Sequence, residues 1–193
     1  ADAALMMNVI SRPDRRDWHA LPIEKPDYLA AVERPSGRRL KIAYARTVND
    51  TPVRNDVANR VGEAIKKIAE YHDVEEVTLD IPDLVMVFNH HWGATAAFMA
   101  AQFTPEQRLL MDKRLQEWAR RGAALPFLDY VGAERKRMEI GFQMMQLLDK
   151  YDLLITPTSA MTAFETGQDM PLMDNGTRWE DWTPFTYIAN LAK

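Results

Sequence analysis

Two short, strand-like segments on either side of one helical segment constrain the fold of this chain most. Residues 40–45, Leu-Lys-Ile-Ala-Tyr-Ala, alternate in polarity and then become apolar, which predicts a β-strand. Residues 74–79, Val-Glu-Glu-Val-Thr-Leu, predict a second strand. Between them, Thr51-Pro52 is typical of a helix start, and apolar residues continue at helical spacing to about Tyr71. This order predicts a βαβ unit with two parallel strands.

A block of long helices is predicted after the βαβ unit. Pro82 can begin a helix that runs to about Phe103, and Thr104-Pro105-Glu106-Gln107 resembles a capping box that opens a helix ending near Gly122. Pro126 can begin the next helix, which has an apolar stripe at helical spacing. The stripe consists of Phe127, Tyr130, Val131, Met138, Phe142, Met145 and Leu148.

The first 38 residues are predicted to form a short helix and a long connection. Residues 2–10 place apolar side chains on neighbouring turns, which predicts a helix with Asp2 as its N-cap. Residues 11–38 contain four prolines and many charges, which predicts irregular structure. We expect its contacts with the protein surface to come from Trp18, Leu21 and Tyr28.

One more strand and one more helix are predicted near the C-terminal end. Leu153-Leu154-Ile155-Thr156 is short and mostly apolar, which suits a buried strand. Residues 157–180 are rich in Pro, Gly, Asn and Asp and predict a loop, whereas residues 182–191 predict a helix. The order of elements indicates an α/β fold with a sheet flanked by helices and a large helical excursion.

The composition excludes several classes of function. The formal net charge is only −4, and no run of Lys and Arg is long enough to follow a nucleic-acid backbone. No apolar stretch approaches the roughly 18 residues that a membrane span needs. The chain has no cysteine, which removes disulfides, cysteine-based zinc sites and thiol nucleophiles, and fits a reducing compartment such as the cytoplasm.

Residue chemistry alone reveals no catalytic site. The serines are Ser11, Ser36 and Ser159, and none lies in a Gly-x-Ser-x-Gly turn or a Gly/Ser-rich loop. Ser159 follows a predicted strand, where catalytic groups often lie, but a structural role is favoured. His90 and His91 are adjacent and would point about 100° apart on a helix, so they do not predict a metal site. Phosphate-binding glycine motifs are absent, and no cofactor is predicted.

Several segments, taken in order, resemble the amidase signature family. The first ten residues and the Arg12-to-Asp17 segment are similar to a helix and loop that follow the catalytic region of the family. Residues 41–77 are similar to the next strand, helix and strand. Residues 151–158, Tyr-Asp-Leu-Leu-Ile-Thr-Pro-Thr, resemble a strand of the family that reads YDLLLTPT. Residues 182–191 resemble the segment that leads into a late Gly-Gln-Pro-Ala sequence. The resemblance therefore covers nearly the whole chain.

The resemblance implies hydrolysis or transfer of amides by a Ser nucleophile, a bridging Ser in a cis peptide and a Lys. In the family these residues lie upstream of the segments matched here, so no catalytic residue is assigned to this chain. We expect residues 1–193 to be one partial domain, inactive by itself, that lacks the catalytic part and the last strands. Its expected role is to supply scaffold and pocket walls to the remainder of an amidase chain that binds a small-molecule amide.

The resemblance also implies which residues line the substrate pocket. In the family, the helical block and the last helix form the walls of the acyl pocket. The matching positions are Thr158, Thr186 and Ala189, and the helical block adds Trp92, Phe98 and Tyr130 as candidates. For these three aromatic residues, ordinary core packing is the favoured alternative.

Other functions remain open at this point. One is that of the glutamyl-tRNA amidotransferase subunit that takes ammonia from glutamine, which the chain resembles less well. Those subunits carry an Asp near the start of the last helix where Thr183 stands here. Their Glu-Val-Lys-Arg-Arg-Ile segment is also replaced by residues 134–138, Glu-Arg-Lys-Arg-Met, in a different setting. Both differences favour a general amidase, and the apolar Ile188 and Ala189 favour an uncharged acyl group.

A non-catalytic interaction module derived from the same fold is a further alternative. The helical block is in addition a candidate homodimer interface.

Overall fold

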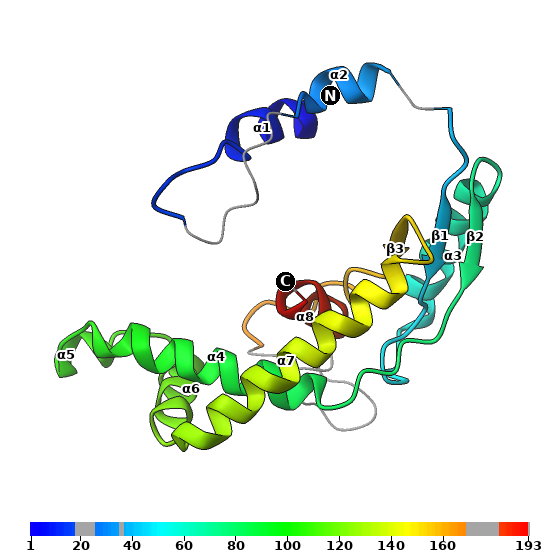
Figure 1. Ribbon diagram of the computed structural model, residues 1–193. Helices are drawn as coiled ribbons and strands as arrows, with labels where there is room; N and C mark the ends of the chain where they lie inside the picture. The colour runs from blue at the N-terminus through cyan, green and yellow to red at the C-terminus, as the bar shows by residue number, and fades with distance from the viewer. Residues whose placement is uncertain (18–25, 35–36, 169–181, 193) are drawn as a thin grey trace. The chain divides into compact units, whose positions relative to one another are not determined.

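The computed structural model describes residues 1–17, 26–34, 37–168 and 182–192 (Figure 1). The chain divides into two compact units, Ala1–Arg39 and Leu40–Lys193. The predicted surface contacts of Trp18 and Leu21 lie outside the described residues.

The first unit contains helices α1 (Asp2–Ile10) and α2 (Tyr28–Glu33). Asn8 on α1 joins the two helices. Its side-chain oxygen accepts a hydrogen bond from the Tyr28 amide at 2.8 Å, and its side-chain nitrogen donates to the Asp27 carboxylate at 3.2 Å. The segment before α2 is therefore held to α1 by one polar side chain.

Two sequence predictions are wrong in this unit. Asp2 lies in the first turn of α1, after Ala1 at the N-cap position, so it does not cap the helix. Helix α2 also interrupts the connection that was predicted to be irregular over residues 11–38. The helix forms there because the Asp27 side chain accepts a hydrogen bond from the Ala30 amide, which satisfies one of the free donors of a helix start.

The second unit contains a parallel sheet and a series of helices (Figure 1). In chain order its elements are β1 (Lys41–Tyr44), α3 (Asn55–Ala69), β2 (Asp73–Glu76), α4 (Leu84–Ala101), α5 (Pro105–Arg108), α6 (Lys113–Ala123), α7 (Phe127–Leu148), β3 (Leu153–Ile155) and α8 (Pro184–Leu191).

The sheet has the strand order β2-β1-β3, and both pairs of neighbours are parallel. Lys41 pairs with Asp73 on one side of β1, and Ile42 pairs with Leu153 on the other. The predicted parallel βαβ unit is therefore confirmed. The prediction that residues 153–156 form a buried strand is only partly correct, because Leu153 is exposed and the rest of β3 is half-buried. Among the described residues, β3 has a neighbouring strand on one side only.

Helix α3 begins later than the Thr51-Pro52 sequence predicts, at Asn55. The amide of Thr51 donates to the carbonyl of Val48, which closes a turn. The amide of Arg54 donates at 2.9 Å to the carbonyl of Ala160 in the loop after β3. This hydrogen bond ties the segment before α3 to the loop after β3.

Asn49 connects the loop after β1 to the segment after β2. Its side-chain nitrogen donates to the carbonyl of Ile81 at 2.9 Å, and its side-chain oxygen accepts from the Ile81 amide at 2.6 Å. Asn49 and Asp50 both have positive φ angles, 49° and 52°, a conformation that Asn and Asp adopt more readily than most residues. The neighbouring residue Val48 forms a parallel bridge with Leu79. These contacts extend the β1–β2 pairing beyond the ends of both strands.

The predicted capping box at Thr104 is present, but the helix that it opens is short. The Thr104 hydroxyl accepts from the Gln107 amide while the Gln107 side chain accepts from the Thr104 amide. Helix α5 ends at Arg108, so the prediction of one helix to Gly122 is wrong. A second cap is responsible, because the Asp112 side chain accepts from two amides at the start of α6.

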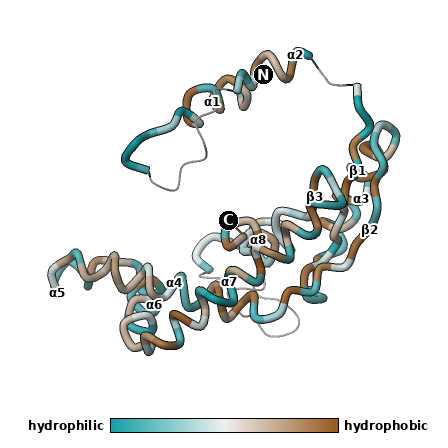
Figure 2. Tube along the Cα trace, viewed as in Figure 1, coloured by the Kyte–Doolittle hydropathy of each residue, from teal (hydrophilic) through white to brown (hydrophobic). Residues whose placement is uncertain are grey.

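The main hydrophobic cluster lies where the ends of β1 and β2 meet helices α4, α7 and α8. We call it the sheet cluster. Its buried members are Ala45, Val48, Leu79, Ile81, Leu84, Val87, Ile140, Met144, Ala160, Phe185, Tyr187, Ile188 and Leu191. Figure 2 shows the apolar character of β1, whose last three residues are all buried.

The apolar stripe predicted on α7 does not face the sheet cluster. The buried side chains of this helix are Ala133, Ile140 and Met144, which lie on another side. Six members of the predicted stripe are exposed, and Tyr130 is half-buried. Helix α7 therefore has apolar side chains on two faces, only one of which packs against described parts of the chain.

Candidate functional site

The carboxyl ends of β1 and β3 define the candidate site, because ligands of open α/β sheets bind at this edge. The loop after β1 and the loop after β3 meet here through the hydrogen bond from Arg54 to Ala160. The Ala45 amide also donates to the Ile155 carbonyl at 3.0 Å, so the two strands stay paired up to the point where the loops begin.

The carbonyl of Trp182 brings the segment before α8 to the same edge. It accepts a hydrogen bond from the Ala160 amide at 3.0 Å and another from the Ser159 hydroxyl at 2.9 Å. The Ser159 hydroxyl is thus used to hold two segments together, which is the structural role that the sequence favoured for it.

The predicted pocket residues Thr158, Thr186 and Ala189 are all exposed. Thr158 directly precedes the Ser159 junction. Thr186 and Ala189 are three residues apart on the exposed face of α8, whose other side is buried in the sheet cluster. The Trp182 carbonyl therefore joins the two elements that carry these three residues, and the side chains are accessible to a ligand.

A row of aromatic rings connects α8 to the middle of α4. The Tyr187 ring stacks on Phe88 with 3.9 Å between ring centroids, and Phe88 stacks on Trp92 at 6.0 Å. The Thr183 hydroxyl donates to the Tyr187 hydroxyl at 3.1 Å, which fixes the far end of the row. Trp92 is 40% exposed, so this predicted pocket residue lies at the open end of a packed aromatic row.

Tyr130 belongs to a polar cluster between α4 and α7. Its ring packs edge-on against His91 at 5.3 Å, and its hydroxyl donates to the Glu134 carboxylate at 3.2 Å. The same carboxylate lies 3.5 Å from Nδ1 of His91 and 3.9 Å from the Arg137 guanidinium. Arg137 in turn donates from Nε to the carbonyl of Leu191 at 3.0 Å. The cluster therefore ties together α4, α7 and the end of α8.

Burial shifts the pKa values of two groups in this cluster, His91 and Tyr130. Burial lowers the pKa of His91, an effect that the nearby Glu134 carboxylate opposes but does not overcome. Nε2 of His91 is buried and has no hydrogen-bond partner among the described residues. Burial also raises the pKa of Tyr130, with a further contribution from Glu134, so its phenol is a hydrogen-bond donor at neutral pH. Sequence analysis missed this cluster, because the spacing between His91 and Glu134 gives no signal that two helices cross there.

Phe98 lies apart from both groups of residues. It is 70% exposed near the end of α4, so it is neither part of the aromatic row nor packed in a core of the described residues. The contacts place Trp92 against Phe88 and Tyr130 against His91, and they leave Phe98 separate from both.

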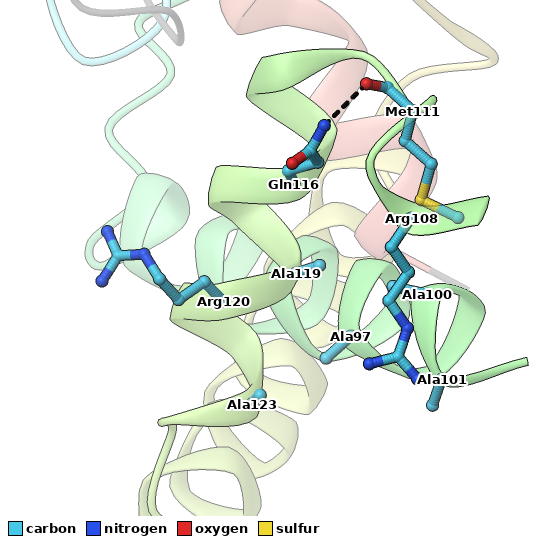
Figure 3. Close-up of a pocket in the computed structure, with 9 residues that line it drawn as sticks. All are labelled: Ala97, Ala100, Ala101, Arg108, Met111, Gln116, Ala119, Arg120 and Ala123. Atoms are coloured by element: carbon cyan, nitrogen blue, oxygen red, sulfur yellow. Dashed lines mark hydrogen bonds between the residues drawn. The ribbon is translucent and has the colours of Figure 1, made fainter. Parts of the chain in front are cut away.

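A cavity of about 320 Å³ lies between α4 and α6 (Figure 3). Most of its walls are alanines, and the Gln116 amide donates to the Met111 carbonyl at 2.8 Å on one side of it. The lining residues are Ala97, Ala100, Ala101, Arg108, Met111, Gln116, Ala119, Arg120 and Ala123. None of the predicted pocket residues lines this cavity.

The described residues offer neither a metal site nor a membrane span. Among them, no group of three or more His, Cys, Asp or Glu side chains is arranged to hold a metal ion. In the same part of the chain, no helix has the length and apolar character needed to cross a membrane.

All 193 residues match the family described as Amidase, so the chain belongs to the amidase family. Among solved structures, a bacterial aryl acylamidase of the amidase signature family is 26% identical and superposes with a TM-score of 0.82 over 99% of this chain. A glutamyl-tRNA(Gln) amidotransferase subunit from Thermotoga maritima is 25% identical, with a TM-score of 0.67 over 99% of this chain. No curated protein matches the chain.

These matches confirm the family and the α/β fold class that the sequence resemblance implied. They also define how much of such an enzyme is present. The chain spans 42% of the length of the aryl acylamidase and 41% of the length of the amidotransferase subunit.

Proposed function

We propose that this chain is part of an amidase that hydrolyses carboxylic amides to an acid and an amine or ammonia. The observation that carries the proposal is the family match over residues 1–193, together with the similarity to an aryl acylamidase over nearly the whole chain. The Ser, cis-Ser and Lys triad would lie in a part of the polypeptide upstream of this chain. Ser159 is not a member of the triad in this proposal, because its hydroxyl is bonded to a backbone carbonyl.

The role proposed for this stretch is to form scaffold and pocket walls. Thr158, Thr186 and Ala189 are accessible at the carboxyl edge of the sheet, where they can contact an acyl group. Helix α8 has no charged side chain between Pro184 and Leu191. Burying a charged substrate group against this face without a partner would cost ~2 kcal/mol or more, so the acyl group is uncharged in our proposal.

The remainder of the amidase chain is the partner proposed for the open side of β3. Among the described strands, β3 pairs only with β1, and an unpaired strand edge is a template for a further strand. A cytoplasmic location is part of the same proposal, because a chain without cysteine needs no oxidising compartment.

The placement of the triad is tested by comparing two proteins on one substrate. An anilide of nitroaniline is suitable because the released amine is coloured. The polypeptide that carries this chain together with the upstream triad should release the amine. Residues 1–193 alone should release none above the buffer rate, since our proposal places the Ser, cis-Ser and Lys triad upstream of them. Turnover by residues 1–193 alone would show that the triad is wrongly placed.

The pocket-wall role is tested by filling the exposed face of α8 in the complete enzyme. Thr186→Trp should raise KM at least tenfold for an anilide with a bulky acyl group and change it much less for a formanilide, because only the bulky acyl group needs the filled space. Thr95→Trp, at an exposed position of α4, is the matched control and should leave both KM values unchanged. Equal effects on the two substrates would contradict the assignment of Thr186.

A second candidate function is that of an amidotransferase subunit, which the similarity to the Thermotoga maritima protein supports. Thr183 weighs against it, because its hydroxyl donates to Tyr187 and it offers no carboxylate to pair with a substrate ammonium group. Release of ammonia from glutamine, with no release of amine from anilides, would favour this candidate over a general amidase.

A further inference from the structure

One face of α7 carries exposed apolar side chains over about five turns of the helix, interrupted by Arg135. Its central side chains are Met138, Phe142 and Met145, which are 73%, 61% and 66% exposed. Phe127 and Val131 continue the face toward the start of the helix. The spacing of these residues, three, four or seven positions apart, puts them on one side of a helix. Large exposed apolar faces of this kind mark interaction sites.

Two opposite charges lie within this face at equal distances from its centre. Arg135 is seven residues before Phe142, and Asp149 is seven residues after it, so each is about two turns away. Both side chains are exposed. Within the described parts of the chain, neither of them takes part in an ion pair. The apolar centre around Phe142 thus has a positive group on one side, between Val131 and Met138, and a negative group on the other.

We propose that this face binds the same face of a second copy of the protein, with the two α7 helices antiparallel about a two-fold axis at Phe142. In this arrangement the two helices run in opposite directions and cross at Phe142. A residue that precedes Phe142 by a given number of positions therefore lies beside the residue of the second copy that follows Phe142 by the same number. Arg135 then faces Asp149 of the second copy, and the reverse pair forms at the other end. Met138 lies within one residue of the level of Met145 of the second copy, and the two Phe142 rings meet on the axis.

The distribution of charge is what favours a second copy over an unrelated partner. A two-fold interface must be complementary to itself, which requires each charge to meet its opposite after rotation. The equal spacing of Arg135 and Asp149 about Phe142 satisfies this requirement. Interface centres are also enriched in Met and aromatic residues, which form the centre of this face at Met138, Phe142 and Met145.

The proposal is tested by charge reversal in the whole protein, with the dimer dissociation constant measured by analytical ultracentrifugation. Arg135→Glu and Asp149→Arg should each raise the dissociation constant at least tenfold, because each places like charges together at both ends of the interface. The double variant R135E/D149R should return it to within about threefold of the starting value. Lys113→Glu, an exposed reversal on α6, should have no effect.

A cross-linking experiment gives an independent readout. Because residues 1–193 contain no cysteine, Phe142→Cys adds one thiol that faces its own copy across the axis. Oxidation should then yield a disulfide-linked dimer, whereas Lys113→Cys should not. A protein that stays monomeric at all concentrations would overturn the proposal. So would a dimer whose dissociation constant is unchanged by the reversals, or single-variant defects that the double variant does not rescue, since rescue cannot follow from a general loss of folding.

Discussion

The sheet cluster and the contact between α4 and α6 hold two regions of this protein together in different ways. In the sheet cluster, large branched side chains such as Ile81, Val48 and Val87 are almost completely buried. Between α4 and α6, the buried side chains are alanines: Ala96, Ala100 and Ala119. We call this second region the hairpin contact. Packing in the sheet cluster relies on large side chains that fill the interior. Packing in the hairpin contact relies on small side chains that let the two helices approach closely.

Two glycines explain the hairpin contact. A methyl group at Gly122 would overlap the carbonyl of Gly93 and come within 2.8 Å of the Ala94 nitrogen. A methyl group at Gly93 would lie 3.3 Å from the Cα of Gly122. The backbones of α4 and α6 therefore approach one another directly at this pair. Since α4 contributes Val87 to the sheet cluster and Gly93 to the hairpin contact, one helix changes from one kind of packing to the other within two turns.

The largest effect is expected from removing volume in the sheet cluster. Ile81→Ala should lower the free energy of unfolding by about 3 kcal/mol, because it removes buried methyl and methylene groups and leaves a cavity. Urea unfolding followed by circular dichroism measures the change. Leu110→Ala is the control, since Leu110 is almost fully exposed, and it should change stability by less than about 0.5 kcal/mol. Similar losses for both variants would contradict the role given to the sheet cluster.

Adding volume should be the damaging change in the hairpin contact. Gly122→Ala should lower the free energy of unfolding by roughly 2 kcal/mol, because the new methyl group must push two helix backbones apart. Gly132→Ala is a matched control on α7, where a methyl group meets nothing within 4 Å. It should raise stability by about 0.5–1 kcal/mol through helix propensity alone. If both variants were stabilising, the direct backbone contact would be disproved.

The elements that could be predicted from sequence are those fixed by local patterns. The strand-helix-strand order followed from alternation around residues 40–45 and 74–79, and the Thr104 capping box lies within four consecutive residues. The Thr51-Pro52 sequence did not indicate that α3 starts at Asn55, and it gave no sign of the hydrogen bond from Arg54 to Ala160 in a distant loop. Periodicity also located an apolar stripe on α7 without indicating that Ala133, Ile140 and Met144 on another side would be the buried residues.

In the candidate site, too, some residues could be predicted from the sequence and others could not. Thr158, Thr186 and Ala189 were chosen through the resemblance to a family, and the structure adds the hydrogen bonds at Trp182 that join their elements. Their role as pocket residues stays a prediction. The contact of His91 with Glu134 could not be predicted, because it exists only where two helices cross.

His91 lies on α4 between Val87 of the sheet cluster and Gly93 of the hairpin contact, so its titration reports on the boundary between the two regions. Burial lowers its folded-state pKa below the ordinary value of about 6.5. The unfolded chain therefore binds a proton more readily than the folded one between these two values. Stability is fully present above about pH 6.5 and falls as the pH drops toward the folded-state pKa.

This effect is the smallest of those expected, and thermal unfolding between pH 5 and pH 7.5 measures it. His91→Gln should remove part of the fall in stability on acidification, because the glutamine side chain does not titrate. Glu134→Gln should make the fall larger, since it removes the carboxylate that favours protonated His91 and lowers the folded-state pKa further. If wild type and His91→Gln lost stability in parallel, folding would not lower the pKa of His91, and Glu134 would then have to offset the effect of burial in full.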